Sequence, residues 1–560
     1  MCLYFHYSPL FKCSTFCLNL LHLYRDPNQA YLSINRCSTT PLRIMQALTT
    51  VILLLGACTY ASEARSFSCC DALTNIPQLK NKVYMPETTQ YEQRLKTYYS
   101  ANAALEPWCM VMPESTQDVS RVATVVSKHS CPFGSRSGAH SAFRGANGVK
   151  DGITIDFGHM NATVYDAKHK LAKIQPGSNW GHVYEALDPY GVAAVGGRAS
   201  VVGVGGFVTG GGYSFHTNVK GFACDQVVNF EVVLADGKIV NANRKQNPDL
   251  WKALKGGSGN VGFVTRIDQR MFLHSAYVCR RVNLLIAILA GVVSSNQLWG
   301  GFIVFDLAQR HAVFDTYIKF VEVNEEDAAS QLIVSVQYDG KQRLLLSVVS
   351  NSDAVESPTA FSPLLSIPNT SNTLTRGKIA DLVPQFTGPT PLGLYANWMT
   401  GMTANDIRIM KFMDEKHEEY VGKMKAAAPG SDFSILVQFQ PVTALMVSHA
   451  RENGGNVLGL EDVTADGPTL MWLIAVTVDT AENQEKIYPL TLEYRAAVNA
   501  YATAIGINKN WEYLNYALGD QNPLSHYGAR NIQTMRRASK KYDPHGVFQR
   551  LRASGFKIPE

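Results

Sequence analysis

The sequence has almost no excess of either charge. Its 51 lysines and arginines stand against 46 aspartates and glutamates, which leaves a formal net charge of +5 over 560 residues. Such a nearly equal number of positive and negative residues does not favour a nucleic-acid partner. We interpret the one basic run near the C-terminus, RRASKK, as a solvated helix face. We therefore expect no nucleic acid among the partners.

Several short motifs are absent as well. There is no HExxH and no CxxC pair, so we expect no metal site. There is no GxSxG, which argues against a hydrolase built on a nucleophile elbow, and no GxxxxGK[ST] phosphate loop.

Long apolar runs are scarce too. Residues 45–64 hold a short apolar core ending in small residues, which is typical of a secretory signal peptide and too short to span a membrane. Because the pattern starts at an internal methionine, we interpret residues 1–44 as an extension of the gene model; a long N-terminal arm with a membrane anchor is the alternative. Residues 274–297 carry an apolar run that fits neither neighbouring strand pattern, and we interpret them as a translated intron, with an inserted helix as the alternative. We expect a secreted protein without a membrane partner.

The cysteines agree with secretion. Four of them can form two disulfides in three possible connectivities: Cys69, Cys70, Cys109 and Cys131. Asn161 and Asn369 each begin a glycosylation sequon, so we expect a disulfide-bonded glycoprotein.

Two regions differ in their hydrophobic pattern. From residue 107 to about 270, short apolar strands such as GITIDF alternate with helical spacing in DVSRVATVVSKHS. From about 300 to 505, long alternating segments such as IVSVQYDG and LMWLIAVTV predict an antiparallel sheet, and residues 404–428 predict an amphipathic helix whose Met and Ile stripe faces the core. The sequence therefore predicts an α+β fold.

Glycines gather in three loops, RSGAHS, VGVGGFVTGGGYS and KGGSGNVGFVT. The third contains a formal GxGxxG from Gly257 to Gly262, but it follows a helical pattern and runs into a strand, which is the wrong context for a dinucleotide fingerprint. We interpret the loops as backbone left bare so that N–H groups can face a flat anionic ligand. His140 lies in the first loop among small polar residues with no apolar face, so we expect it to meet that ligand.

These loops carry a resemblance. RSGAHS, GSNWGHVYEALDPYGVAAVGGR, VGVGGFVTGGGYSF, WEYLNYA and KYDPHGVFQRL are similar to fungal FAD-linked oxidoreductases of the berberine-bridge-enzyme-like branch of the vanillyl-alcohol oxidase and p-cresol methylhydroxylase (PCMH) superfamily. The resemblance covers nearly everything from Cys69 to Ile558 except the 274–297 segment. It implies a PCMH-type FAD-binding domain of two α+β subdomains and a substrate domain whose antiparallel sheet is backed by helices. The implied boundaries are 65–273 for the FAD-binding domain, 298–505 for the substrate domain, and 506–560 for a C-terminal segment that completes the first.

The resemblance also implies the cofactor and the residues that hold it. In this family the loop histidine bonds covalently to the 8α-methyl group of the flavin, which here would be His140, and flanking backbone N–H groups bind the pyrophosphate. The implied FAD-binding residues are Arg136, Ser137, Gly138, Ala139, His140, Ser141, Gly203, Gly205, Gly206, Gly210, Gly211, Gly257, Gly262, Val264 and Asn515.

Two positions depart from the family pattern. Many relatives carry a second link through a cysteine where this chain has Ala199, so we predict a single covalent link. Ala139 replaces a glycine beside the histidine; if this position has a positive φ, alanine there costs about 1 kcal/mol.

Oxidation by FAD needs a base for the substrate proton. Tyr513 in WEYLNYA is our first candidate, Tyr516 the next, and His216 beyond the second glycine loop a further acid/base candidate; packing roles are the alternative for all three. We expect a monomeric oxidase that moves a hydride from an alcohol, sugar or secondary-metabolite substrate to FAD, with O2 reoxidising the flavin to give H2O2. An oxidative cyclase or dehydrogenase of secondary metabolism is the alternative, and a non-catalytic secreted protein or inactive product is a third.

Overall fold

The structure is a computed structural model that describes residues 68–271 and 296–560. The interpretations of residues 1–44 and 45–64, and almost all of the 274–297 segment, lie outside the described residues. Within the described ranges, no helix combines the length and the apolar composition that a membrane span requires.

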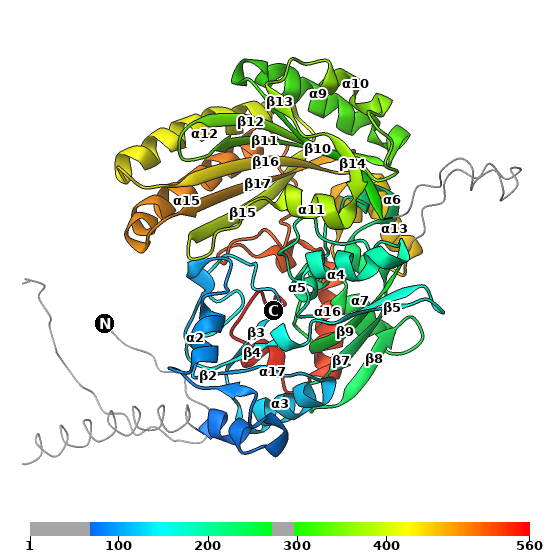
Figure 1. The fold of residues 1–560 in the computed structure, drawn as a ribbon, viewed down its shortest axis with the longest axis vertical. Helices are drawn as coiled ribbons and strands as arrows, with labels where there is room; N and C mark the ends of the chain where they lie inside the picture. Colours follow the sequence, from blue (N-terminus) through cyan, green and yellow to red (C-terminus); the bar gives the residue numbers. More distant parts are fainter. Residues whose placement is uncertain (1–67, 272–295) are drawn as a thin grey trace, which may run out of the picture. The chain divides into compact units, whose positions relative to one another are not determined.

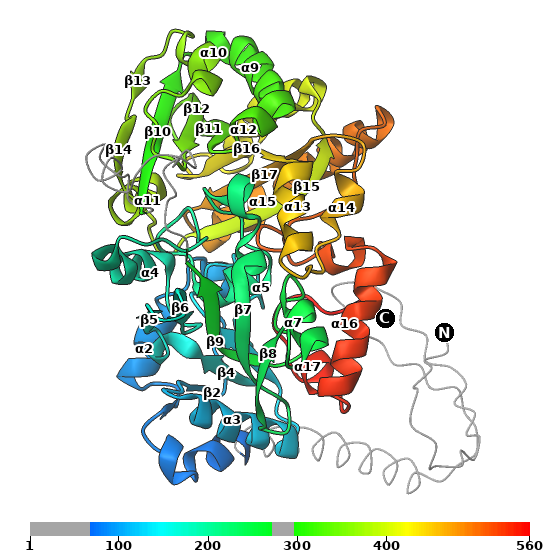
Figure 2. The same ribbon diagram turned by 90° about the vertical axis from the view of Figure 1, so that its right-hand side faces the viewer.

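Residues 68–271, here called the two-sheet region, contain a four-stranded and a five-stranded sheet (Figures 1 and 2). In the first sheet, with strand order β1-β2-β4-β3, strand β4 pairs in parallel with β2 and β3. The second sheet has the order β5-β6-β9-β7-β8 and is antiparallel. The strands are β1 (Val83–Tyr84), β2 (Cys109–Val111), β3 (Phe133–Arg136), β4 (Ile153–Asp156), β5 (Thr163–Asp166), β6 (Leu171–Ile174), β7 (Val227–Val233), β8 (Ile239–Asn243) and β9 (Phe263–Arg270).

Local sequence sets the helices of this region. Helix α3 (Thr116–His129) begins where the Ser115 side chain accepts the backbone N–H of Asp118, and it ends at Ser130 in the left-handed conformation. Its predicted apolar face, which includes Val119 and Val122, is buried. The other helices are α2 (Thr89–Leu95), α4 (Trp180–Leu187), α5 (Val204–Thr209), α6 (Thr217–Lys220) and α7 (Pro248–Leu254).

Residues 296–505, the eight-stranded region, form a mostly antiparallel sheet of order β13-β10-β12-β11-β16-β17-β15, with β14 on β10. Its strands are β10 (Gln297–Phe305), β11 (Ser330–Tyr338), β12 (Arg343–Asn351), β13 (Ser371–Asn372), β14 (Thr375–Lys378), β15 (Tyr395–Ala404), β16 (Ser434–Val442) and β17 (Thr469–Val478). Its helices are α9 (Arg310–Val323), α10 (Ser362–Leu365), α11 (Ile379–Thr387), α12 (Ile407–Ala427), α13 (Ala444–Glu452), α14 (Leu460–Val463) and α15 (Ala481–Ala504).

The two faces of the large sheet have different neighbours. Helices α9, α12 and α15 pack on one face, and the predicted Met stripe of α12 is buried there (Figure 1). On β11, Leu332, Val334 and Val336 point into this core, whereas the alternate residues line a cavity on the other face. The predicted α+β class and the antiparallel sheet are confirmed.

The chain ends back on the two-sheet region. Helix α16 (Ala529–Tyr542) packs on α7, where Lys541 pairs with Asp249 at 2.7 Å, and α17 (Val547–Arg550) follows it (Figure 2). The next residues run beside β3, with Phe133 N–H donating to Leu551 O at 2.9 Å.

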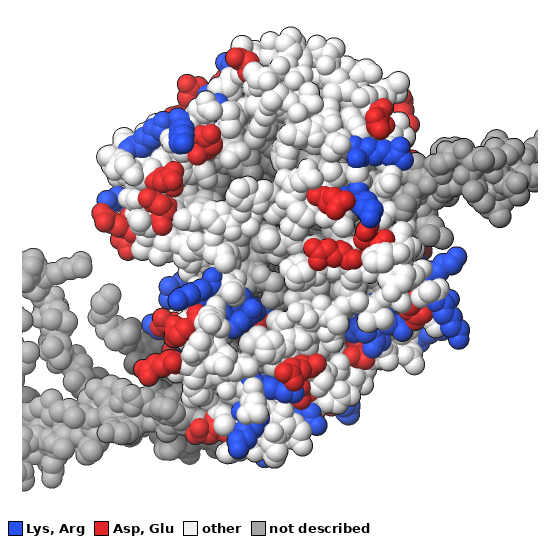
Figure 3. All heavy atoms as spheres, in the orientation of Figure 1, with Lys and Arg blue, Asp and Glu red and all other residues white. Residues whose placement is uncertain are grey.

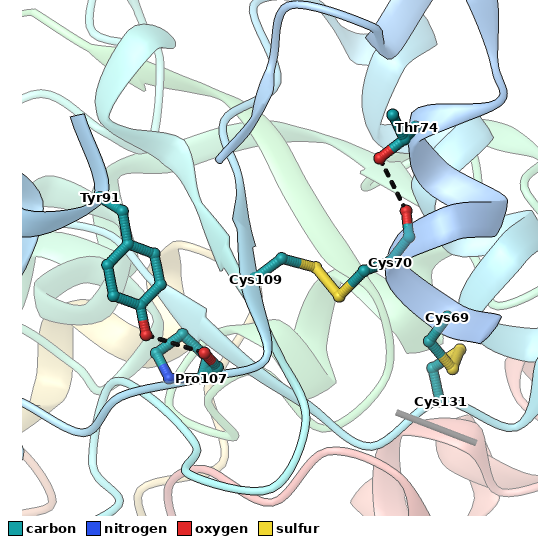
Figure 4. The surroundings of a disulfide bond; sticks show 7 residues. All are labelled: Cys69, Cys70, Thr74, Tyr91, Pro107, Cys109 and Cys131. Carbon is teal, nitrogen blue, oxygen red and sulfur yellow. Dashed lines mark hydrogen bonds between the residues drawn. A yellow bond between two sulfur atoms is a disulfide. The ribbon is translucent and has the colours of Figure 1, made fainter. Parts of the chain in front are cut away.

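Two disulfides fix the start of the described chain (Figure 4). Cys69 bonds Cys131 and Cys70 bonds Cys109, which selects one of the three possible connectivities. They join the helical residues 68–74 to β2 and to the segment after α3. Cys224 is a buried free thiol.

Surface charges are mixed. On the face shown in Figure 3, acidic and basic side chains are interspersed between uncharged ones. This distribution agrees with the nearly balanced composition and shows no extended field of one sign on that face.

Candidate active site

A cavity of about 610 Å³ lies between the glycine loops and the large sheet. The first glycine loop, the loop after residue 197, the segment 513–516 and the chain end at 552–556 all contribute to its wall. Strands β10, β11, β12, β15, β16 and β17 close its other side. Loops far apart in the sequence therefore meet around one space.

His140 lies in the wall of this cavity and is held by aromatic rings. Its imidazole stacks on Tyr99 with 4.0 Å between ring centroids, and the edge of Trp398 approaches at 5.8 Å. Burial lowers the pKa of His140 to about 4, because desolvation disfavours the charged ring. The imidazole is thus neutral at physiological pH and its nitrogen lone pair is free to act as a nucleophile.

The first and second glycine loops touch backbone to backbone. A side chain on Gly138 would collide with the backbone of Gly203, and one on Gly203 would collide with Gly138. Ser137 adds a bridge, since its Oγ donates to Pro176 O and accepts from the Gly205 N–H at 3.2 Å. Only residues without a Cβ allow this approach, which explains why glycines gather here.

Ala139 adopts a left-handed backbone conformation, which is the positive φ for which we expected a cost of alanine at this position. Its φ is +53°, and its side chain is 2% exposed. An L-residue at such a φ carries about 1 kcal/mol of strain, so the alanine is tolerated at a small expense of stability.

Tyr513 anchors the second glycine loop. Its hydroxyl oxygen accepts the backbone N–H groups of Gly212 at 3.1 Å and Tyr213 at 2.9 Å, and the Asn515 amide at 3.0 Å. The side chain is 1% exposed, and burial raises its pKa. With both lone pairs occupied, the oxygen is poorly placed to accept a substrate proton.

The surroundings of Tyr516 differ from those of Tyr513. Its half-buried ring meets Trp398 and Tyr513 edge to face, at 5.5 and 4.9 Å between centroids. Arg198 Nη2 donates to the Tyr516 hydroxyl at 3.0 Å, which places a fixed positive charge beside that oxygen. Arg198 also lies over the Tyr213 ring at 4.3 Å. A cation in this position can stabilise negative charge that develops on the hydroxyl oxygen during a proton transfer.

A chain of polar side chains continues from Arg198 across the sheet. Arg198 donates to Gln440 Oε1, Gln440 Nε2 donates to Gln438 Oε1 at 2.9 Å, and Gln438 Nε2 reaches Ser335 Oγ at 3.5 Å. Because each amide is held by the next, the guanidinium has one orientation toward Tyr516. The remaining sheet residues in the wall are mostly apolar: Phe302, Ile333, Leu346, Val348, Leu436 and Leu473.

The structure brings most of the predicted site residues together. The following predicted residues line the cavity: Arg136, Ser137, Gly138, Ala139, His140, Ser141, Gly203, Gly205, Gly206, Gly262, Val264, Tyr513, Asn515 and Tyr516. Gly210, Gly211 and Gly257 lie behind the wall; a side chain on Gly257 would collide with Ala253 O. His216 is 3% exposed at the start of α6 and is not among the lining residues. Their assigned roles stay predictions.

Many wall residues were not predicted from the sequence, and three of them are important for the chemistry of the site: Arg198, Trp398 and Arg552. Arg198 directly precedes Ala199 and could have been noticed in GGRAS, since a cation beside a glycine loop is unusual. Trp398 and Arg552 have no local signal, because each reaches the cavity only through its place in a strand or in the chain end.

The residues present fit FAD. A Cβ on Gly206 would meet nothing within 4 Å, so bare backbone faces the cavity. In the part of the chain that the structure describes, the wall holds three arginines and no aspartate or glutamate. A glycine-lined, acid-free wall suits a large ligand with phosphate groups.

Comparisons with known proteins agree with this fit. The FAD binding domain family matches residues 107–243. The chain is 34% identical over 501 residues to the FAD-dependent monooxygenase drtC of Aspergillus calidoustus, across 88% of this chain and 90% of that protein. It is also 34% identical over 495 residues to the FAD-dependent monooxygenase sdcF of Emericella nidulans, across 88% of this chain and 98% of that protein.

Solved structures show the same fold at lower identity. A 6-hydroxy-D-nicotine oxidase from Arthrobacter nicotinovorans aligns with a TM-score of 0.67 at 18% identity, over 85% of this chain and 97% of that one. A xylooligosaccharide oxidase from Myceliophthora thermophila aligns with a TM-score of 0.67 at 18% identity, over 86% and 98%. At this identity the likeness establishes the fold and not the substrate.

Proposed function

The chain belongs to the PCMH-type FAD-binding flavoenzymes of the vanillyl-alcohol oxidase and berberine-bridge-like group, and from this premise we propose that it oxidises an apolar, ring-bearing metabolite with a hydroxyl group. The observation that carries the proposal is the pairing of Arg198 with Tyr516 in a cavity wall that is otherwise largely apolar. FAD, when bound, supplies the hydride acceptor and passes the electrons to O2.

His140 is the proposed single attachment point of the flavin. Its neutral imidazole lies in the glycine loop, and Tyr99 and Trp398 fix the ring plane. Ala199, also in the wall, offers no sulfur for a second link. These features support one covalent bond.

Tyr516 is the proposed base. As the substrate C–H bond gives up its hydride, the hydroxyl proton moves to the Tyr516 oxygen, and the C–O bond becomes a carbonyl. Arg198 stabilises the charge on Tyr516 before the proton arrives, and the glutamine chain keeps the guanidinium in place. Tyr513 instead holds the second glycine loop in place through its hydrogen bonds to Gly212 and Tyr213.

The substrate class follows from the sheet wall. Sugars need many hydrogen bonds, but the strands contribute seven apolar side chains, with Trp398 included, and only three polar ones. Phe386 from α11 adds a further aromatic surface. The wall therefore supports a secondary-metabolite intermediate rather than an oligosaccharide, whether the product is an oxidised ketone, a dehydrogenated ring or a newly closed ring.

A second candidate is oxygen insertion, because the relatives at 34% identity are named monooxygenases. The two reactions differ in the fate of O2: an oxidase releases H2O2, and a monooxygenase transfers one oxygen atom to product. Turnover under ¹⁸O2 with H2O2 quantified in parallel separates them.

Secretion is also proposed. Two disulfides stabilise the described chain, and such bonds persist in oxidising compartments. The sequon residues Asn161 and Asn369 are both exposed.

The first test combines flavin attachment with a substrate screen. The protein is purified from a secretory host and denatured in acid, and the flavin absorbance that stays with the polypeptide is measured for the unaltered chain and for His140→Ala. Anaerobic flavin bleaching is then compared between hydroxylated polycyclic aromatics and oligosaccharides. Flavin retained only by the unaltered chain, with bleaching by the aromatics, is the expected result; bleaching by oligosaccharides alone would overturn the substrate class.

A further inference from the structure

Two of the three arginines in the cavity wall, Arg198 and Arg552, form no ion pair with a carboxylate of the described residues. Arg136 lies 3.4 Å from the Asp156 carboxylate, and Arg198 shares its charge with Tyr516 and a tyrosine ring. Arg552 is 4% exposed and, over residues 68–271 and 296–560, forms no ion pair with any carboxylate. A buried charge without a counter-charge is strongly unfavourable, so an anion is expected beside it.

The hydrogen bonds of Arg552 leave part of its guanidinium unused. Nη2 donates to Asn260 Oδ1 at 2.8 Å and to Phe556 O at 2.6 Å, whereas the buried Nε has no partner among the residues that the structure describes. Nη1 lies over two glycines, where a Cβ on Gly259 or Gly555 would stand 3.4 or 3.1 Å from it. Both glycines line the cavity, so this end of the side chain faces the open space.

The amine of Lys557 lies in the same corner. Its Nζ donates to Phe548 O at 3.1 Å and to Arg552 O. Burial, together with the charge of Arg552, lowers the pKa of Lys557 to about 6. Desolvation likewise lowers the pKa of Arg552 to about 10. Both shifts arise mainly from desolvation, which disfavours positive charge in a corner where no carboxylate of the described residues pairs with either side chain.

The position of Arg552 identifies the anion. Its segment runs along the strand that leads to His140: Ala553 N–H donates to Phe133 O at 2.7 Å, and Gly555 N–H donates to Gly145 O at 3.1 Å. The opposite side of the guanidinium meets the third glycine loop through Asn260. The three segments that meet here, 133–145, 257–262 and 551–556, all belong to the glycine-loop side of the cavity and not to the sheet wall.

We infer that Arg552 binds the phosphate groups of the cofactor and that this contact holds the C-terminal segment over the cavity. The inference rests on the proposed flavin site. It assigns to Arg552 the positive charge that would balance the phosphate groups, which the backbone of the glycine loops does not supply. The cofactor's diphosphate carries negative charge at neutral pH, and a guanidinium binds phosphate oxygens with two parallel N–H groups.

The test uses full-length protein carrying His140→Ala, so that flavin binding is reversible. Affinities for FAD and for riboflavin, which has no phosphate, are measured by flavin fluorescence in this background and with Arg552→Met or Arg552→Lys added. Arg530→Met, an exposed arginine on α16, is the matched control. We expect Arg552→Met to weaken FAD binding by about 10- to 100-fold and to leave riboflavin binding unchanged, with Arg552→Lys between.

Thermal unfolding gives a second readout, because the difference in unfolding temperature between Arg552→Met and its parent should change sign when FAD is added. Without flavin, Arg552→Met removes an uncompensated buried charge and should unfold at a higher temperature than its parent; with saturating FAD the order should reverse. Equal weakening of FAD and riboflavin, or a lower unfolding temperature both with and without FAD, would show a purely structural role and overturn the inference. Loss of all flavin binding in the His140→Ala parent would overturn the flavin site as well.

Discussion

Replacing Tyr513 or Tyr516 by phenylalanine removes one oxygen from either of two neighbouring rings, and the structure predicts opposite consequences. In Tyr513→Phe the backbone N–H groups of Gly212 and Tyr213, which both belong to buried residues, lose their acceptor. Each unsatisfied buried donor costs about 1–3 kcal/mol, so we expect the loss of both bonds to lower the free energy of unfolding by about 2–6 kcal/mol. The pH dependence of turnover should keep its shape.

Tyr516→Phe should have the opposite effect, with a small change in stability and a large change in the rate of flavin reduction. The hydroxyl of the half-buried Tyr516 accepts from Arg198, whose guanidinium keeps Gln440 and the Tyr213 ring as partners. We expect a loss of stability under about 1 kcal/mol. Loss of a general base should slow anaerobic flavin reduction by about 10²- to 10⁴-fold and remove the limb of the pH profile that reports the base.

The assays are denaturant unfolding of the flavin-loaded variants and stopped-flow flavin reduction with the substrate found in the screen. Tyr527→Phe is the matched stability control, because its buried hydroxyl has no partner in the described part of the chain and its removal should be neutral or stabilising. A Tyr516→Phe enzyme that reduces its flavin at the normal rate, or a Tyr513→Phe enzyme that is fully stable and catalytically dead, would refute the assignment of the two rings.

Three further predictions concern the cofactor loop and the disulfides. Because the pKa of His140 is held at about 4, below its usual 6.5, flavin attachment should be constant from pH 8 to pH 5 and fall only toward pH 4; a midpoint near 6.5 would contradict the buried setting. Ala139→Gly relieves about 1 kcal/mol of strain and loses a similar amount through chain entropy, so its melting temperature should hardly change, whereas Ala139→Val should lower flavin content in absorbance measurements. Joint replacement of Cys70 and Cys109 by serine opens a loop with a sequence separation of 39 and should lower the free energy of unfolding by about 4 kcal/mol, measured by denaturant titration; a change below 1 kcal/mol would show that this bond adds little.

Much of the fold could be predicted because its signals are local. The apolar spacing of α3, the alternation along β11 and β17, and the Met stripe of α12 each reflect which face of one element is buried. The glycine loops were also readable, since close backbone approach demands glycine wherever it occurs. Even the strain at Ala139 followed from one residue type in one motif.

The active-site roles were less accessible to sequence reasoning. Tyr513 and Tyr516 lie in one short motif, and nothing local says which oxygen accepts buried backbone N–H groups and which faces an arginine. His216 is close to a glycine loop in sequence, yet it lies at the start of a short helix and outside the cavity wall.

The sequence by itself determined the fold class and the glycine loops that line the cavity, and it singled out His140 in the first of them, because those features depend on residue type and short-range spacing. Only the tertiary structure decided which cysteines pair, which tyrosine stands beside Arg198, and that Arg552 reaches the cavity from the far end of the chain. Each of these depends on contacts between segments tens to hundreds of residues apart. Such contacts are set by how the sheets pack and where the chain returns, and no local pattern encodes them.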